Sequence, residues 1–445
     1  MLVKPSILRY HELRKQRKYS EYFRKRGEEH MEPIFFHIDV NSAFLSWTAI
    51  ERLEQGDTVD LRQIPSIIGG DKEKRHGIVL AKSIPAKAFH IQTGEPIVKA
   101  LEKCSALTIA APDHAMYHKR SRMLMDYLKT LTPDIEQVSI DECYMDFSTI
   151  IHRYPSAIEA AHQIKDTIYN TMGFTVNVGI SDCKVLAKMA SDFKKPNLVH
   201  TLYRHEIKEK MWPLPVSSLF MCGKSSVDEL RKLEILTIGD LACADPEIIF
   251  LHLKSHGKLL WEYANGIDNS KVEPIRPDAK GIGNSTTLAK DAEDISSIHE
   301  VLLSLSDSVA SRIRKANSLA YMVSVEVKYN TFLKNSHQTT LSSPTNTSDT
   351  IYQTACRLFD ELWDGTPVRL LGIRCTKLVD VNEPVQMSLL DYDFATTSNT
   401  TAKISINNHT SSQNEEKNKK LDSALDSIRK RYGSSAVVRG SMLKK

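Results

Sequence analysis

Two acidic clusters, about one hundred residues apart, each lie at the end of a strand-like run. Asp39 follows the apolar residues 34–38, and Asp141 and Glu142 lie at a corner between two strand-like runs over residues 135–147. Short apolar runs of this kind are typical of buried strands. Carboxylates at neighbouring strand ends repel one another unless a hard divalent cation neutralises them. We therefore expect Asp39, Asp141 and Glu142 to form one Mg²⁺ site.

Paired acids of this kind suit phosphoryl transfer. Two Mg²⁺ ions about 3.5–4 Å apart can hold both the attacking and the leaving oxygen of an in-line displacement. A plainer interpretation makes Asp39 a cap of the following helix and residues 141–142 a polar hairpin turn. That interpretation suffices for any one acid alone, whereas the two clusters together favour a metal site.

Composition indicates a water-soluble globular protein. The 445 residues are too many for one ordinary core, so two to four domains are expected. No stretch approaches the ~20 apolar residues that a membrane span needs, and no apolar core follows the N-terminal charges as a secretory signal would require. Seven cysteines without a Cys-x-x-Cys pair favour reduced thiols in a cytoplasm over disulfides or zinc.

The N-terminal segment, residues 1–32, differs in charge from the rest. Residues 1–30 hold nine Lys or Arg against four Glu, a local charge of +5, whereas the whole chain has a net charge of +4. A basic arm is one interpretation. A solvated helical leader, or a true start at Met31, explains the same residues equally well.

The remaining pattern predicts an α+β fold in several parts. Strands and helices alternate from residue 33 to about 205, short helices follow over 206–270, and prolines mark a linker at 271–280. A second α+β unit is expected over 281–380. The Thr-, Ser-, Asn- and Lys-rich residues 391–420 have the composition of a disordered segment.

The two acidic motifs, His37–Phe44 and Ser139–Cys143, resemble those of Y-family DNA polymerases of the DinB or DNA polymerase IV type. Three further segments carry the same resemblance, which runs in order from about residue 33 to 390: Val178–Ser181, Lys184–Asp192 and Lys194–Asn197. It implies a right-hand polymerase with palm, fingers, helical thumb and α+β little finger. The implied boundaries are palm 33–43 and 113–205, fingers 44–112, thumb 206–270, linker 271–280, little finger 281–380 and tail 381–445.

The resemblance also implies roles for individual residues around the metals. Asp39 and Asp141 would bind both Mg²⁺ ions, Glu142 would complete the site, and the main-chain carbonyl of Val40 would be a further ligand. Phe44 would be the steric gate that excludes the 2′-hydroxyl of a ribonucleotide. Without the resemblance, Phe44 reads as a core aromatic residue of an amphipathic helix.

The triphosphate-binding residues depart from the family pattern in part. Lys195 is the expected ligand of the β- and γ-phosphates, although alone it reads as a solvated loop lysine. The family often has Ser-Tyr-Glu-Ala-Arg where this chain has Ser83-Ile84-Pro85-Ala86-Lys87. Lys87 keeps the positive charge without the bidentate fork of Arg, and Ile84 cannot donate a hydrogen bond.

Two segments are expected to contact macromolecules. Gly223, Lys224 and Ser225 resemble the thumb's helix-hairpin-helix, whose backbone N–H groups bind a DNA phosphate, although Met221 stands where the family has Gly. A peptide after the second α+β unit resembles the Gln-Leu-Ser-Leu-Phe motif that docks on the bacterial sliding clamp. It consists of Gln386, Met387, Ser388, Leu389 and Leu390.

The expected activity is template-directed addition of deoxynucleotides to a primer 3′ end, with low fidelity and past damaged template bases. The expected partners are primer-template DNA, deoxynucleoside triphosphates and the sliding clamp, with the chain itself a cytoplasmic monomer. Two alternatives stay open. A non-catalytic regulatory member of the family would bind DNA and clamp without synthesis, and a palm-type nucleotidyl cyclase would share the acids but need no DNA-binding modules.

Overall fold

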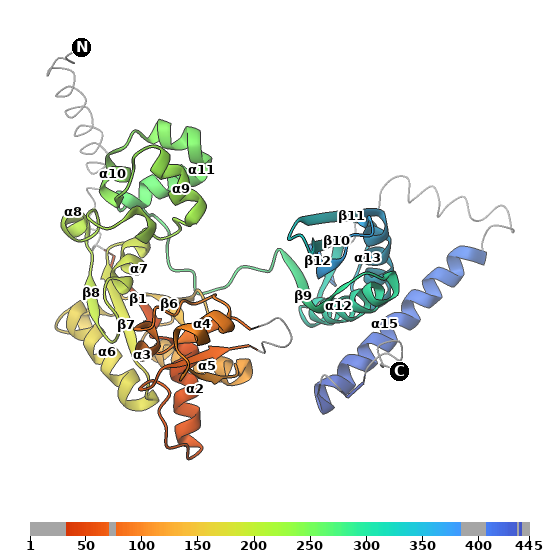
Figure 1. The fold of residues 1–445 in the computed structure, drawn as a ribbon, viewed down its shortest axis with the longest axis horizontal. Helices are drawn as coiled ribbons and strands as arrows, with labels where there is room; N and C mark the ends of the chain where they lie inside the picture. Colours follow the sequence, from red (N-terminus) through yellow and green to blue (C-terminus); the bar gives the residue numbers. More distant parts are fainter. Residues whose placement is uncertain (1–32, 71–76, 384–405, 434–435, 438–445) are drawn as a thin grey trace, which may run out of the picture. The chain divides into compact units, whose positions relative to one another are not determined.

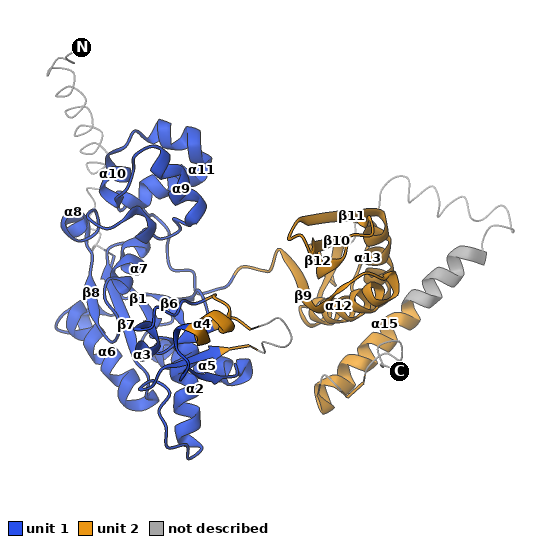
Figure 2. Ribbon diagram, in the orientation of Figure 1, with its two compact units in different colours: residues 1–68, 80–93, 103–276 blue, residues 69–79, 94–102, 277–445 orange. Residues whose placement is uncertain are grey.

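The computed structural model describes residues 33–70, 77–383, 406–433 and 436–437 (Figure 1). The chain forms two compact units (Figure 2). The first comprises residues 1–68, 80–93 and 103–276, and the second comprises residues 69–79, 94–102 and 277–445.

A five-stranded sheet organises the first unit. Its central strand β1 pairs antiparallel with β6 on one side and with β7 on the other. The order is β5-β6-β1-β7-β8, with β1 at Phe35–Val40, β5 at Ile135–Gln137, β6 at Glu142–Asp146, β7 at Val176–Ser181 and β8 at Val199–Thr201. Residues with long apolar side chains such as Phe36 and Ile38 point to one face because successive side chains of a strand alternate.

The two faces of this sheet have different partners. Helices α5 (His114–Leu131) and α6 (Ala157–Met172) pack with the apolar face in one buried core. The alternate positions of β1 and β7, His37 and Gly179, are buried beneath helix α7 (Lys184–Asp192). The polar ends of β1 and β6 are therefore presented on the α7 side.

Shorter elements complete the first unit and its neighbouring segments. Helix α2 (Ala43–Glu54) follows β1 directly. A three-stranded sheet has the order β3-β2-β4, with β2 at Ser66–Gly69, β3 at Val79–Lys82 and β4 at Thr108–Ala110; the helices of this region are α3 (Ile84–Lys87) and α4 (Ile97–Lys103). The single-turn 3₁₀ helices are η1 (Ile151–Arg153), η2 (Arg204–Glu206) and η3 (Val216–Ser218).

The helical segment predicted after residue 205 is present. Its helices are α8 (Ile207–Lys210), α9 (Lys224–Lys232), α10 (Ile238–Cys243) and α11 (Pro246–Ala264). They share a second apolar core with α7, in which Leu186 and Met189 pack with residues such as Leu230 and Leu260. Helix α7 thus has one face on the sheet and another in the helical segment.

The second unit is built on a four-stranded antiparallel sheet of order β11-β10-β12-β9. The strands are β9 (Gly281–Ala292), β10 (Ser318–Tyr329), β11 (Lys334–Thr345) and β12 (Val368–Asp380). Helices α12 (Ile295–Lys315) and α13 (Ser348–Leu362) contribute to one core with this sheet (Figure 1). The α+β fold expected over 281–380 is therefore observed.

A long C-terminal helix, α15 (Ile406–Tyr432), differs from the sequence-based expectation. The composition predicts disorder up to residue 420, but the helix already begins at Ile406. Its last turns carry acidic and basic side chains that bind α12 and α13: Arg314 of α12 contacts both Asp422, at 3.0 Å, and Asp426, at 2.7 Å. Composition cannot reveal such long-range ion pairs.

Candidate active site

The carboxylates of Asp39 and Glu142 are brought together by strand pairing. Asp39 and Glu142 are register partners across β1 and β6. The N–H of Val40 donates to the carbonyl of Asp141 at 3.0 Å, which fixes the corner that precedes β6. Val40 itself is buried. The sheet therefore places the two predicted acidic clusters side by side, as their positions in the sequence predict.

Asp141 points to a different set of partners. Its Oδ1 accepts a hydrogen bond from Ser139 Oγ at 2.6 Å. Burial raises the pKa of Asp141, and the negative charges of Asp39 and Glu142 raise it further, against the lowering effect of Ser139. Mutual repulsion of this kind is what an added cation would relieve.

Two lysines neutralise the acids. Lys188 Nζ lies 2.7 Å from Glu142 Oε2 and 3.2 Å from Asp39 Oδ2. Lys195 Nζ lies 3.0 Å from Asp39 Oδ1 and 2.8 Å from Asp192 Oδ1. Burial lowers the pKa of both lysines, but the neighbouring carboxylates outweigh it, so each pKa lies above its ordinary value. Both ammonium groups are held charged within the site.

His37 is a further buried member of the site. Its Nδ1 is 2.8 Å from Ser191 Oγ on α7, and its Nε2 is 3.3 Å from Glu142 Oε2. Burial lowers the pKa of His37. The contact with His37 and the ammonium of Lys188 together hold the pKa of Glu142 at about 2. Glu142 is thus ionised at any physiological pH.

These side chains fit a hard divalent cation. One ligand atom from each of His37, Asp39 and Glu142 lies within 4.8 Å of the others. Asp141 is outside that group because its side chain turns to Ser139. Carboxylate oxygens are the ligands that Mg²⁺ prefers, and the two lysines already balance part of the negative charge. The structure therefore brings the carboxylates of Asp39 and Glu142 together, whereas the side chain of Asp141 is bonded to Ser139.

The loop that carries Lys195 is held by two buried asparagines. Asn177, the register partner of Asp39 on β7, donates to the carbonyls of Ser191 at 3.1 Å and Lys194 at 2.6 Å. Asn41 accepts from the N–H of Asn197 at 2.9 Å. Sequence reasoning did not single out these asparagines, nor His37 or Ser191. A usable signal was the two-residue spacing of His37 and Asp39, which puts both on one strand face.

Phe44 lies at the start of α2 and is partly buried. Its ring stacks on Tyr117 of α5, with ring centroids 4.3 Å apart and planes 6° apart. The edge of His114 meets the same ring, with centroids at 6.1 Å. Thr48 and Tyr117 share a hydrogen bond of 3.0 Å between their hydroxyls, which fixes the ring behind Phe44. Phe44 is thus held rigidly five residues after Asp39.

The motif at residues 83–87, which departs from the family pattern, forms a helical turn. Ser83 Oγ accepts from the N–H of Ala86 at 3.1 Å and caps α3. Ile84 is 56% exposed, and Lys87 at the end of the turn is exposed as well. More than half of Ile84 is thus open to solvent, at the position where the resemblance implies a tyrosine.

The segment that resembles a helix-hairpin-helix contains α9. Gly223 directly precedes this helix, so the backbone N–H groups of Lys224 and Ser225 lie at the start of the helix. Met221 has φ 68°, in the left-handed region, and its side chain is 52% exposed. The family's Gly at this position is explained, since glycine adopts that conformation without steric cost.

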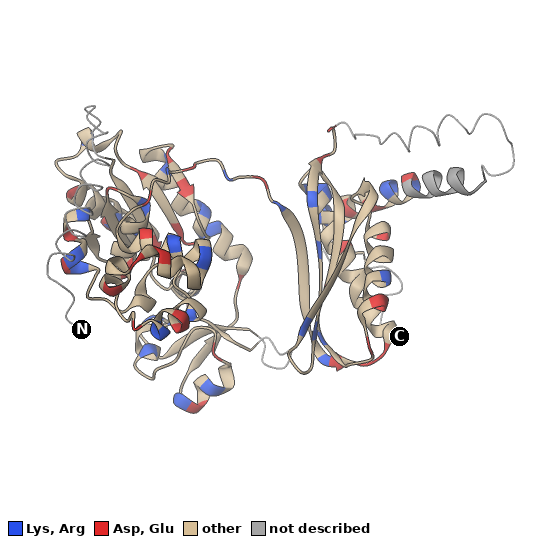
Figure 3. Ribbon diagram, turned by 90° about the horizontal axis from the view of Figure 1, so that it is seen from above, with Lys and Arg blue, Asp and Glu red and all other residues tan. Residues whose placement is uncertain are grey.

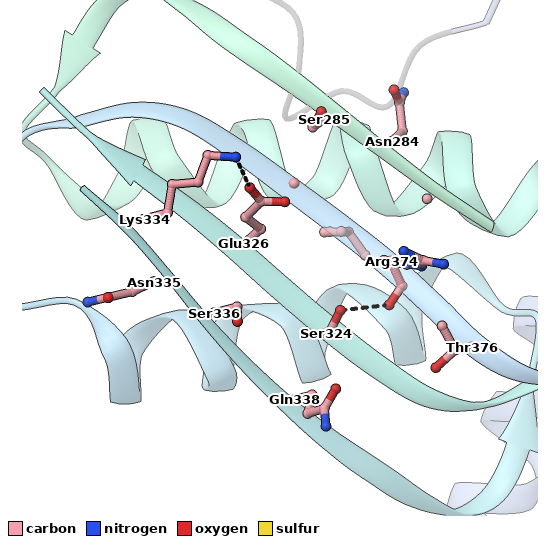
Figure 4. Close-up of a pocket in the computed structure, with 13 residues that line it drawn as sticks. Asn284, Ser285, Ser324, Glu326, Lys334, Asn335, Ser336, Gln338, Arg374 and Thr376 are labelled. Carbon is pink, nitrogen blue, oxygen red and sulfur yellow. Dashed lines mark hydrogen bonds and ion pairs between the residues drawn. The ribbon is translucent and has the colours of Figure 1, made fainter. Parts of the chain in front are cut away.

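The sheet of the second unit has an open polar face. A groove of about 720 Å³ runs along it, and Figure 4 shows the side chains that line it. Lys334 pairs with Glu326 at 3.1 Å, and Ser324 donates to the carbonyl of Arg374 at 3.3 Å. The four strands carry six Lys or Arg and three Asp or Glu, whereas α12 and α13 carry four and five. Figure 3 shows these Lys and Arg residues on the strands.

Two predicted features lie elsewhere. The clamp-like peptide Gln386–Leu390 and the N-terminal residues 1–32 are outside the described residues. Among the described residues, no helix has the length and apolar character of a membrane span.

Comparison with known proteins agrees with these features. Residues 38–192 match the impB/mucB/samB family, and residues 279–389 match its C-terminal domain. "DNA polymerase IV" of Clostridium acetobutylicum is 44% identical over 415 residues, covering 93% of this chain and 99% of that protein. "DNA polymerase IV 1" of Bacillus subtilis is 31% identical, with 93% and 94% covered.

The fold has a solved counterpart. A Y-family DNA polymerase chimera superposes with a TM-score of 0.69 at 21% identity, covering 78% of this chain and 99% of that chain. Shared family, fold and paired strand-end acids lead to one assignment: the chain belongs to the Y family of DNA polymerases, as a DNA-directed DNA polymerase of the DNA polymerase IV type.

Proposed function

We propose that this polymerase extends a primer 3′ end by two-metal phosphoryl transfer, with low fidelity, and copies past damaged template bases. The observation that carries the proposal is the register pairing of Asp39 with Glu142, which sets two carboxyl groups at adjacent strand ends. The nucleotidyl cyclase alternative is not supported, because the chain also has a helix-hairpin-helix and a second α+β unit that a cyclase does not need.

Asp39, Asp141, Glu142 and the carbonyl of Val40 are the proposed ligands of two Mg²⁺ ions. When bound, the ions lower the pKa of the primer 3′-hydroxyl and neutralise charge on the triphosphate. Asp141 would have to turn from Ser139 to join them, and the cations would offset the burial and the neighbouring negative charges that raise its pKa. Lys188 keeps its charge beside Glu142 and balances the carboxylates while no substrate is bound.

The proposed nucleotide contacts follow from the same geometry. Lys195 lies at the edge of the acidic site, with its Nζ 3.0 Å from Asp39, so it can turn to the β- and γ-phosphates. Lys87 is exposed on its helical turn and can add a second positive charge. Phe44, held against Tyr117, would meet a ribose 2′-hydroxyl.

Two surfaces are proposed to hold the DNA backbone. Gly223, Lys224 and Ser225 begin α9 and present N–H groups to a phosphate. The polar face of the second unit, with Lys334 and Arg374 in its groove, would track the template strand. In the same proposal the palm is 33–43 and 113–205, the fingers 44–112, the thumb 206–270, the little finger 281–380 and the tail 381–445.

The remaining proposals concern the cellular setting. Gln386–Leu390 would dock the polymerase on the bacterial sliding clamp, with Leu390 giving a weaker contact than the usual Phe. We place the protein in the cytoplasm as a monomer that is recruited to primer-template DNA by this peptide.

Primer extension tests the proposed chemistry. We expect wild type to add nucleotides in Mg²⁺ and the double variant Asp141→Ala/Glu142→Ala to add none above background. Asp126→Ala/Glu159→Ala is the matched control, because both acids are exposed and their loss changes net charge equally. Equal extension by wild type and the Asp141/Glu142 variant would exclude the two-metal site. Absence of extension by wild type, with DNA binding intact, would favour the non-catalytic alternative.

A further inference from the structure

His37 and Ser191 form a buried connection between α7 and the acidic site. His37 has no exposed surface, and its Nε2 has no hydrogen-bond partner of good geometry within the described residues. The nearest acceptor is Glu142 Oε2, 3.3 Å away. A buried polar atom without a partner is costly, so its direction toward Glu142 calls for an explanation.

The close approach of α7 makes this connection possible. Gly179 is the register partner of His37 on β7. A Cβ at Gly179 would lie 2.0 Å from the carbonyl oxygen of Ala187 and 2.5 Å from the backbone nitrogen of Ser191. The absence of a side chain at Gly179 therefore lets α7 lie on the sheet, and Ser191 Oγ reaches His37 Nδ1 at 2.8 Å.

The protonation of the imidazole follows from the partners. An ionised carboxylate only accepts hydrogen bonds, so Nε2 must carry the proton that faces Glu142. In a neutral imidazole Nδ1 then accepts, and the Ser191 hydroxyl donates to it. The Ser191 hydroxyl can also donate to the carbonyl of Lys188, 2.8 Å away. In the opposite tautomer that carbonyl would be its only acceptor, and the Nε2 lone pair would face the carboxylate of Glu142.

We propose that Ser191 and His37 are positioning residues that fix the carboxylate of Glu142 for metal binding, through a relay from Ser191 Oγ–H to His37 Nδ1 and from His37 Nε2–H to Glu142 Oε2. Lys188 donates to the same oxygen. Both contacts therefore fall on Oε2, and Oε1 is the oxygen left to face the metal. Outer hydrogen bonds of this kind orient metal ligands and commonly change metal affinity by roughly 10- to 100-fold.

The inference rests on the proposed two-metal function, but its first test does not require catalysis. Histidine ¹⁵N–¹H correlation spectra of the full chain report the tautomer, and the His37 signals are assigned by their loss in His37→Gln. We expect Nε2 of His37 to carry a proton. A neutral Nδ1–H tautomer would overturn the relay, because the Nε2 lone pair would then face Glu142 and could bind the metal directly.

Mn²⁺ binding, measured by electron paramagnetic resonance without DNA or nucleotide, supplies the second test. His37→Phe keeps the ring volume without the donor, and we expect its Mn²⁺ dissociation constant to rise roughly 10- to 100-fold. His37→Gln can place an N–H near the position of Nε2, and we expect it to retain wild-type affinity within about threefold. Equal affinity of His37→Phe and wild type would overturn the proposal.

Ser191→Ala keeps the proposal testable if His37→Phe does not fold. It removes the orienting hydroxyl, and we expect a rise in the Mn²⁺ dissociation constant of roughly 10-fold. Ser181→Ala is the matched control, since Ser181, at the end of β7, is as fully buried as Ser191 but donates to the carbonyl of Leu202. An equal effect of both serine variants would assign the change to general destabilisation and refute the relay.

Primer extension then separates the two proposals. We expect His37→Phe to lower kcat for nucleotide addition with little change in the KM for the deoxynucleotide, because Lys195 and Phe44 are untouched. An inactive wild type with an intact relay would refute the proposed function alone. An active wild type whose kcat and Mn²⁺ affinity are unchanged by His37→Phe would refute the relay alone.

Discussion

Phe44 and Tyr117 lie face to face, with their ring centroids 4.3 Å apart and their planes 6° apart. We expect Phe44→Ala to raise ribonucleotide incorporation relative to deoxynucleotide roughly 100-fold, because an unfilled space admits the 2′-hydroxyl. Tyr117→Ala keeps the gate ring but removes its support, so an intermediate loss of discrimination is expected. Tyr117→Phe, which loses only the hydroxyl, is the control. Single-nucleotide incorporation with both substrates measures the ratio; unchanged discrimination in Phe44→Ala would refute the gate.

Lys188 makes three ion pairs in the acidic site, including one of 3.4 Å with Asp192. Its loss leaves the partly buried Glu142 without an ammonium partner and Asp39 with Lys195 alone, which costs up to roughly 3 kcal/mol. We therefore expect Lys188→Met to have a lower unfolding temperature than wild type in EDTA. Mg²⁺ should raise the unfolding temperature of Lys188→Met more than that of wild type, since a cation that binds the folded state stabilises the folded state. Lys195→Met, with a more exposed lysine, should show a smaller effect. An equal Mg²⁺ response in Lys188→Met and wild type would contradict the electrostatic account.

Met221 adopts a left-handed backbone conformation, with φ 68°. That conformation costs a non-glycine residue about 1 kcal/mol or more, and little burial is lost because the side chain is half exposed. We expect Met221→Gly to raise the thermal unfolding midpoint by a few degrees. The control is Asp228→Gly, within α9, where glycine should destabilise by about 1 kcal/mol. A lower midpoint for Met221→Gly would show that the side chain has a packing role.

Much of the proposed metal site can be predicted from the sequence. Short apolar runs predict the strands, and the acids at the ends of these runs are read directly from the sequence. The positions of Asp39 and Glu142 beside strand-like runs are local consequences of the sequence pattern. The rest depends on distance: Ser191 meets His37 from 154 residues away, and Asn177 holds the Lys195 loop through carbonyls on another element. Nothing in either segment indicates its partner.

The contacts of the C-terminal helix also join residues that are far apart in the sequence, so the sequence does not indicate them. Arg429 of α15 lies 2.7 Å from Asp307 of α12, whose side chain is almost fully buried. Asp307 also accepts from Ser348 Oγ, but Arg429 brings a positive charge to this buried carboxylate, so Arg429→Met should destabilise the chain by about 3 kcal/mol. Arg431→Met, on the same helix but exposed, is the control. Thermal unfolding of the full chain compares them, and equal midpoints would mean that Asp307 is satisfied without the helix.

Acid should weaken this docking through Asp426. Burial raises the pKa of Asp426, but hydrogen bonds from Arg314 and Ser311 outweigh it, so the pKa is lowered overall. A lowered folded-state pKa means that the stabilisation is complete above the unfolded value of about 3.9 and is lost as pH falls through the folded value. Asp426→Asn should therefore differ from wild type in unfolding midpoint at pH 5–7 and converge with it below about pH 4. A constant difference across this range would refute the assignment.

The buried carboxylate of Asp307 has a practical consequence for genetics at the 3′ end of the gene. A stop codon placed after the last sheet strand would remove Arg429 together with the proposed clamp peptide Gln386–Leu390. The phenotype of such a strain would mix loss of the proposed recruitment with destabilisation of the second unit. Alanines written over the five peptide residues alone, with the helix left intact, would report on recruitment without that second defect.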